Sequence, residues 1–315
     1  MRILLLCMLL IFVGCEELVE VESVLHKPSI VISSYTVSHK NPYVYVTHTQ
    51  PAYSTSISKI DDFNASITNV TSGYEYALTP NYNFDYITFT TNELEYESGG
   101  IYRIELYNST GDVEAFATDT IPYPALIVDA SVQPIGNDFY NQVSISIKSI
   151  NEVTQSQYFE VALYLAEIWD DDDDLEFYSS TTPLKSNHPL ITRETYYPDL
   201  MLIGSGYPET LLFRFDENQQ EALVDFMYET SSSWNPLTGY QFPEHYLRVE
   251  LRAVSKAYFH YKTSKYTQMY AVEGDFLYGI APPVAVMSNI VGGYGIFAGY
   301  AKVDTVMHIA SRTID

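Results

Sequence analysis

The cysteine at position 15 stands in a setting that predicts a covalent modification. Arg2 is followed by an apolar run over residues 3–13, and Gly14 directly precedes Cys15. A positive start, an apolar run of this length and a small residue before the cut are typical of a secretory signal over residues 1–15. The eleven apolar residues would cover about 16 Å as a helix, roughly half of the hydrocarbon thickness, which is too short for a stable membrane span.

A small residue followed at once by Cys is the arrangement of a bacterial lipobox. We therefore expect the thiol of Cys15 to be lipidated and Cys15 to begin the mature protein. The alternative is an ordinary cleaved signal in which this cysteine has no role. With the lipid in place, the mature body contains no further cysteine, which excludes a disulfide, a thiolate nucleophile and a zinc–cysteine site there.

The sequence contains no local motif of a zinc enzyme or of a serine hydrolase. The seven histidines show no His-x-x-x-His or His-x-His spacing, and no Gly-x-Ser-x-Gly motif is present. Neither a local zinc site nor a hydrolase elbow is supported. We therefore predict a protein that is not an enzyme. A hydrolase whose active site assembles from distant residues is the remaining catalytic alternative.

Five consecutive aspartates, 170–174, are the strongest candidate for a metal site. A hard cation such as Ca²⁺ takes several carboxylate oxygens and relieves their mutual repulsion, so Asp170, Asp172 and Asp174 are candidate calcium ligands. The run lacks the spacing of an EF-hand loop. The alternative is a solvated acidic tip between two strands, without any metal. No other cofactor is predicted.

Tyrosine is unusually frequent, with 29 copies. Aromatic side chains offer a large contact area at low entropic cost, and their faces stack on sugar rings or peptide side chains. The adjacent pair Tyr196 and Tyr197 is a candidate binding site. The alternative for most tyrosines is that they fill half-buried strand positions.

Basic residues are scarce, yet five of the sixteen fall in one stretch: Arg248, Arg252, Lys256, Lys262 and Lys265. On a strand that leads into a helix, these side chains are expected to pair with the acidic surface. The alternative is that they face an anionic partner or ligand.

The segment from 282 to 300 has the most distinctive pattern. Apolar residues alternate over 284–290 and again over 296–300, and Gly292-Gly293 lies between them. Glycine adopts positive φ at low steric cost, so this pattern predicts a structural hairpin formed by Asn289, Gly292, Gly293 and Gly295. A phosphate cradle would need a strand–loop–helix context, which excludes nucleotide binding here.

These features resemble a known family. The expected helix around 257–270, the Pro283-Val284 step and the motif Ser-Asn-Ile…Gly-x-Gly-Ile-Phe…Gly-Tyr over 288–300 are similar to a Bacteroidota outer-membrane lipoprotein family. That family is catalogued as domain-of-unknown-function 4249. The resemblance implies a lipoprotein that is often encoded beside a TonB-dependent transporter. It implies no reaction and supplies no catalytic residues.

The expected elements are mainly short strands. After an acidic tether over 16–28, seven strands are predicted within 29–121, and turn residues separate them: 29–37, 43–48, 65–70, 75–78, 86–90, 101–107 and 114–120. Seven short strands in about 95 residues are typical of an immunoglobulin-like sandwich. The two prolines of 121–124 then form a stiff connector, where we place a domain boundary.

The second unit, 125–315, is expected to be larger and β-rich, with one or two helices. Strands are predicted at 126–132, 142–147, 158–168 and 246–253. A helix near 217–228 is suggested by Asp216 with Gln219 three residues later, a capping box, and a second helix is expected near 255–270. The predicted fold class is therefore mostly β.

The charge of the chain restricts its partners. A formal net charge of −24 repels nucleic acid and anionic headgroups, so the lipid must provide the membrane attachment. We predict an outer-membrane, cell-surface lipoprotein that acts as an accessory or ligand-binding partner of a TonB-dependent transporter in nutrient uptake. The alternatives are a structural or adhesive protein of the cell envelope and the hydrolase described above.

Overall fold

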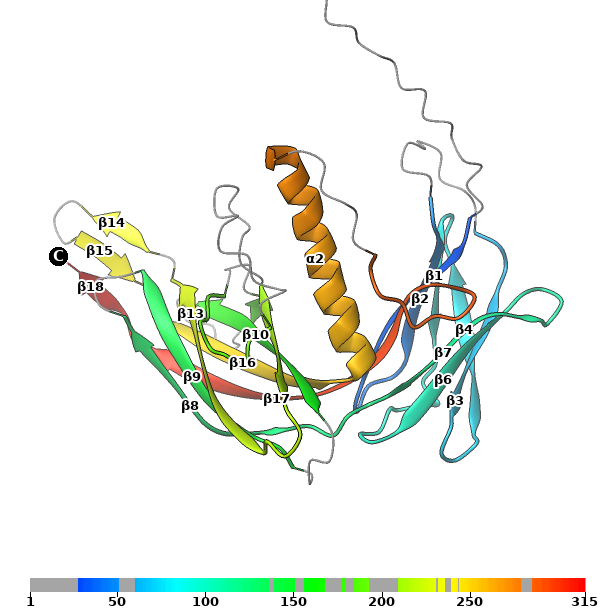
Figure 1. Ribbon diagram of the computed structural model, residues 1–315, viewed down its shortest axis with the longest axis horizontal. Helices are drawn as coiled ribbons and strands as arrows, with labels where there is room; N and C mark the ends of the chain where they lie inside the picture. The colour runs from blue at the N-terminus through cyan, green and yellow to red at the C-terminus, as the bar shows by residue number, and fades with distance from the viewer. Residues whose placement is uncertain are drawn as a thin grey trace, which may run out of the picture.

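The computed structural model describes residues 28–50, 60–135, 139–150, 156–167, 177–179, 184–192, 209–230, 232–235, 239–242, 244–278 and 285–314. The fold is mostly β, as predicted, and it consists of two β-structured halves (Figure 1). One helix is found among the described residues.

The first half contains the seven predicted strands. They are β1 (Ile30–Val37), β2 (Tyr43–His48), β3 (Asn64–Asn69), β4 (Glu75–Tyr82), β5 (Tyr86–Thr90), β6 (Ile101–Tyr107) and β7 (Val113–Thr120). Every second side chain of β1 is buried, which is the period of two that a strand with one face on a core must show. These strand predictions are confirmed.

The strands of this half form a sandwich whose two layers share β4. Residues 75–78 of β4 pair with β3, whereas residues 79–82 pair with β5. The pairing order is β1-β2-β5-β4-β3-β6-β7. An isolated bridge between Phe116 of β7 and Val291 brings the last of these strands back toward the C-terminal segment.

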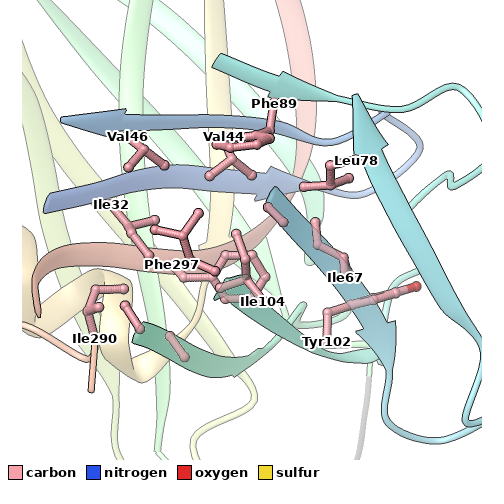
Figure 2. Close-up of a cluster of buried hydrophobic side chains, with 14 of the residues drawn as sticks. Ile32, Val44, Val46, Ile67, Leu78, Phe89, Tyr102, Ile104, Ile290 and Phe297 are labelled. Carbon is pink, nitrogen blue, oxygen red and sulfur yellow. The ribbon is translucent and has the colours of Figure 1, made fainter. Parts of the chain in front are cut away.

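The core of the first half lies between the two layers (Figure 2). Ile32, Val44 and Phe89 come from one layer, and Ile67 and Ile104 come from the other. The same cluster includes three residues from near the end of the chain, Ile290, Phe297 and Ala301. The first core is therefore completed by side chains that lie far away in the sequence.

The long strand β17 (Gly293–Ile309) joins the two halves. Its first part pairs in parallel with β1, from Ile30↔Gly293 to Val37↔Tyr300. Its second part pairs antiparallel with β16 (His245–Val254), from Val254↔Tyr300 to His245↔Ile309. Strands of both halves consequently belong to one continuous sheet, and in Figure 1 β17 runs from one half into the other.

The second half is also a sandwich. The large sheet continues through β16, β10 (Gln157–Glu167) and β11 (Tyr178–Ser179), and β12 (Thr210–Phe215) also pairs with β10. A three-stranded sheet of β8 (Leu126–Pro134), β9 (Tyr140–Lys148) and β13 (Glu221–Glu229) packs against its face. A small third sheet consists of β14 (Ser233–Asn235), β15 (Gly239–Phe242) and β18 (Arg312–Ile314).

The helix predicted near 217–228 is wrong, because this segment forms β13. Half of the expected capping interaction exists, since the Asp216 N–H donates to the Gln219 side chain at 3.4 Å. Asn218 nevertheless adopts a φ of 71° and turns the chain. The following residues pair with β9 over nine positions, and Val224, Phe226 and Tyr228 are buried with the period of a strand.

The second predicted helix is confirmed as α2 (Lys256–Tyr278), which is longer than expected. Ser255 caps its start, because the side-chain oxygen of Ser255 accepts a hydrogen bond from the Tyr258 N–H at 3.1 Å. The helix packs on the face of the large sheet opposite the core of the second sandwich. Its contact residues Tyr258 and Phe259 cluster with Leu212, Ile296 and Ala298 of that face.

Candidate functional site

Three of the predicted sites lie outside the described residues. They are the lipidation site Cys15, the calcium candidates Asp170, Asp172 and Asp174, and the tyrosine pair Tyr196 and Tyr197. The four residues of the C-terminal motif and the five basic residues are described. Among the described residues, no group of three or more His, Cys, Asp or Glu side chains could hold a metal ion. No described helix combines the length and the apolar character that crossing a membrane requires.

The C-terminal motif forms a turn but not the predicted hairpin. Residues 285–290 are not a strand. Instead, the Asn289 side chain substitutes for one, because its Nδ2 donates to the Phe297 carbonyl at 2.7 Å and its Oδ1 accepts from the Phe297 N–H at 3.0 Å. Gly292 has a φ of 83°, as a tight turn requires. The hairpin prediction fails because β17 finds its backbone partners in β1 and β16.

The glycines of this motif allow β17 to lie against other backbone. A Cβ on Gly292 would lie 2.1 Å from the Glu114 carbonyl oxygen, and one on Gly293 would lie 2.6 Å from the Ile30 oxygen. Gly295, with a φ of 103°, would place its Cβ 2.0 Å from the Ile32 oxygen. Any side chain at Gly295 would therefore push β17 away from β1.

Two of the five basic residues lie in a buried ion network under α2. Glu160 on β10 is fully buried, and its Oε2 accepts from Nη1 of Arg252 on β16 at 2.7 Å. The Lys262 ammonium on α2 lies 3.6 Å from the other carboxylate oxygen. The hydroxyls of Tyr258 and Thr210 also donate to this carboxylate. The helix is thus held to the sheet through a buried charge.

A second buried carboxylate extends the network. Glu250 on β16 accepts from the Arg252 Nε at 2.7 Å and pairs with Lys302 on β17. Burial alone would raise the pKa of Glu160, but the charges of Lys262 and Arg252 hold it below its usual value. The pKa of Glu250 is likewise lowered, because Lys302 and Arg252 outweigh its burial. Both acids are therefore ionised and saturated by their partners, which indicates a structural role.

The other three basic residues differ in their surroundings. The Arg248 guanidinium lies over the rings of Tyr164 and Phe177, at 4.5 and 4.7 Å from their centroids. Lys256 and Lys265 are exposed on α2. The expectation that the basic stretch pairs with the acidic surface is therefore wrong for Arg252 and Lys262. Their partners are strand acids that only the fold brings under the helix.

A cleft lies where the two halves meet. It has a volume of about 610 Å³. Its walls come from the end of β7, the connector to β8, the end of β9, the start of β10 and the β16–α2 junction. Its lining includes Asp119, Tyr123, Ser149, Gln157, Ser255 and Lys256. Ligand sites commonly have about 300–1,000 Å³ and commonly lie between domains.

Asp119 holds three elements together at the back of this cleft. Its Oδ2 accepts from the Gly299 N–H at 2.8 Å, which joins the end of β7 to β17. It also accepts a hydrogen bond from Ser255, the cap of α2. Burial raises the pKa of Asp119, and these hydrogen bonds limit the rise. The walls of the cleft are therefore fixed to one another.

Sequence reasoning did not find this cleft. Its lining residues come from stretches around positions 120, 150, 157 and 255, so no local motif marks it. The signal that was present is the Pro122-Tyr123-Pro124 connector. The two prolines predict a boundary there, and the structure places Tyr123 in the wall of the cleft.

Comparisons with known proteins give one informative match. The family model described as Domain of unknown function (DUF4249) matches residues 16–305. A search of curated proteins found no match.

Two solved structures are similar only at low scores. A crystal structure of a Salmonella alpha-2-macroglobulin mutant has a TM-score of 0.24 at 8% identity, covering 90% of this chain and 15% of that one. The chicken CNTN1 FN1-FN3 domains have a TM-score of 0.23 at 11% identity, covering 89% of this chain and 66% of that one.

Proposed function

Because the chain belongs to the family described as Domain of unknown function (DUF4249), whose name assigns no activity, we propose a function from the geometry and the chemistry of the chain. The protein is a non-enzymatic, lipid-anchored protein of the outer membrane. It presents a ligand-binding cleft and acts as the partner of a TonB-dependent transporter in nutrient uptake.

The observation that carries this proposal is the fixed cleft between the two halves. Its opposite walls are joined by β17, which pairs with strands of both halves. They are also joined by the Asp119–Gly299 hydrogen bond, and α2 is held to the sheet by the Lys262–Glu160 ion pair and the Tyr258–Glu160 hydrogen bond. A site that is already formed requires little ordering when a ligand binds, which favours affinity.

The membrane location rests on the sequence. Cys15 follows a signal-like apolar run and Gly14, as an acylated cysteine requires. The formal net charge of −24 opposes electrostatic binding to anionic headgroups. The lipid at Cys15 would therefore supply the attachment, and multiple acyl chains anchor more firmly than one.

The test is a mild-detergent purification of the tagged, lipidated protein from its native outer membrane, with mass spectrometry of the proteins that come along. We expect a stoichiometric TonB-dependent channel. The matched control is Cys15→Ala, which should no longer fractionate with membranes and should no longer recover the channel from them.

Either of two results contradicts the proposal. Recovery of the protein alone from several detergents would eliminate a stable transporter complex and favour a structural or adhesive role in the envelope. Membrane fractionation of Cys15→Ala would eliminate the lipid anchor.

A further inference from the structure

The cleft contains a feature that its size alone does not explain, an exposed aromatic ring in a fixed position. Tyr123 lines the cleft and is 55% exposed. Its ring lies over Gly99, where a Cβ would be 2.5 Å from the ring atoms. The glycine therefore provides the space that the ring occupies.

The backbone beside Tyr123 is fixed as well. The Gly99 N–H donates to the Ile121 carbonyl at 2.7 Å, and the Ile121 N–H donates to the Gly100 carbonyl at 2.9 Å. Pro122 and Pro124 flank the tyrosine and restrict the neighbouring backbone angles. An exposed ring that is held in this way is a pre-organised contact surface, since little side-chain entropy remains to be lost on binding.

The rest of the lining combines apolar side chains with uncharged hydrogen-bonding groups. The hydroxyls of Thr120 and Ser156 and the amide of Gln157 are at least partly exposed, whereas Ser149 and Ser255 are buried. Two charged side chains of opposite sign, Asp119 and Lys256, are also present. The lining therefore carries no net formal charge, and Asp119 already accepts hydrogen bonds from Gly299 and Ser255.

A ligand that fits this lining has an apolar face for the ring and many hydroxyls for the rim. An anionic ligand would also meet the field of a chain with a formal net charge of −24. We propose that the cleft binds a neutral oligosaccharide, with one sugar ring stacked on Tyr123 and its hydroxyls bonded to the Ser, Thr and Gln side chains. This inference rests on the proposal above that the cleft is a ligand site.

The test measures binding of the full lipidated protein, kept in mild detergent, to an array of neutral and acidic oligosaccharides. The strongest neutral ligand is then titrated by calorimetry against four forms of the protein: wild type, Tyr123→Ala, Tyr123→Phe and Lys256→Gln. We expect Tyr123→Ala to weaken binding about tenfold, the factor that corresponds to losing one aromatic stacking contact.

The other two variants are matched controls. Tyr123→Phe keeps the ring and should leave the affinity unchanged. Lys256→Gln should also leave it unchanged, because a neutral ligand gains nothing from the ammonium. Thermal unfolding of each variant checks that a loss of binding is not a loss of fold.

Three results overturn the inference: no neutral oligosaccharide binds, folded Tyr123→Ala binds as well as wild type, or only acidic oligosaccharides bind and Lys256→Gln abolishes their binding. These outcomes are separable from the transporter test. Co-purification of a channel without oligosaccharide binding would contradict only the proposed ligand class. Oligosaccharide binding by a protein that purifies alone would contradict only the proposed transporter partnership.

Discussion

At the scale of single residues, two buried carboxylates of the described chain, Glu160 and Glu250, belong to one ion network under α2. Glu160 and Glu250 are almost completely inaccessible, and the Arg252 side chain, at 15% exposure, bridges them. Placing ions in a protein interior costs several kcal/mol per charge, so such a network contributes favourably only when every member keeps its partners. Removing one member leaves the others buried without compensation.

We therefore expect Glu160→Ala to lower the free energy of unfolding by about 3–5 kcal/mol, since the Arg252 and Lys262 charges would lose their shared carboxylate. Urea unfolding followed by circular dichroism measures the change. Glu217→Ala, on an exposed turn, is the matched control and should stay within about 0.5 kcal/mol of wild type. Equal effects of the two substitutions would show that the network does not stabilise the fold.

The same network predicts how stability depends on pH. The pKa values of Glu160 and Glu250 are lowered in the folded state from the usual 4.5. Their stabilisation is therefore present above pH 4.5 and is lost as the pH falls toward their folded values. Asp119 affects the pH dependence of stability in the opposite direction, because burial raises its folded pKa above the usual 3.8. Protonation of Asp119 therefore favours the folded state.

Urea titrations between neutral and acidic pH measure both effects. We expect the stability of the wild type to fall below pH 4.5. It should fall less steeply in Glu160→Gln and more steeply in Asp119→Asn. If the free energy of unfolding falls with pH at the same slope in Glu160→Gln as in the wild type, Glu160 is not a source of the acid sensitivity.

At the scale of elements, β17 determines how the halves are joined. Its pairing with β1 is parallel, and parallel neighbours cannot be joined by a tight turn. They must therefore come from distant parts of the chain, here the first described strand and the last long one. The close backbone approach at Gly293 and Gly295 explains why glycines lie at the start of this strand.

Gly295→Ala is expected to destabilise the protein by more than about 3 kcal/mol, because a Cβ would collide with the Ile32 carbonyl and strain a positive φ. Gly73→Ala is the matched control. Gly73 also has positive φ, 75°, but nothing lies within 4 Å of its Cβ position, so only the backbone cost of about 1 kcal/mol should appear. Thermal unfolding measures the loss of stability in both variants. Equal decreases in melting temperature would exclude the contact with the Ile32 carbonyl as the cause of the loss in Gly295→Ala.

At the scale of the whole molecule, two hydrophobic cores are connected by this one strand. Phe297 and Ala301 belong to the first core, whereas Ile309 belongs to the second. Opening either half therefore removes a backbone partner from the other. Among the described residues up to 278, those of the first core end at Ile121 and those of the second begin at Ala125, whereas Ile290 returns to the first core and β17 contributes to both.

Hydrogen exchange should therefore report coupled opening of the two halves. We expect amides of β2 in the first half and of β10 in the second to exchange with the same free energy of opening as denaturant is added. Mass spectrometry after pulsed labelling makes the measurement. Complete exchange of the first half while β10 stays protected would show that the strand does not couple them.

The sequence by itself determined much of the local structure. The seven strands of the first half and the helix at 256–278 were predictable, because alternation, turn residues and capping act between near neighbours. The glycine pattern around 292–295 predicts a hairpin, and the structure has a turn there with positive φ at Gly292 and Gly295 but no hairpin. The strand partner of this segment could not be read from it, because Gly293 and Gly295 pair with Ile30 and Ile32 of β1, more than 250 residues earlier in the chain.

Only the tertiary structure decided the remainder. Residues 221–229 carry apolar side chains compatible with either a helix or a strand, and the open edge of β9 selected the strand. Glu160, Glu250 and Arg252 look like ordinary surface charges in sequence until α2 covers them. The cleft exists only because four distant stretches meet at the joint. Burial and long-range pairing depend on what the rest of the chain places opposite a residue, and local residue patterns do not contain that information.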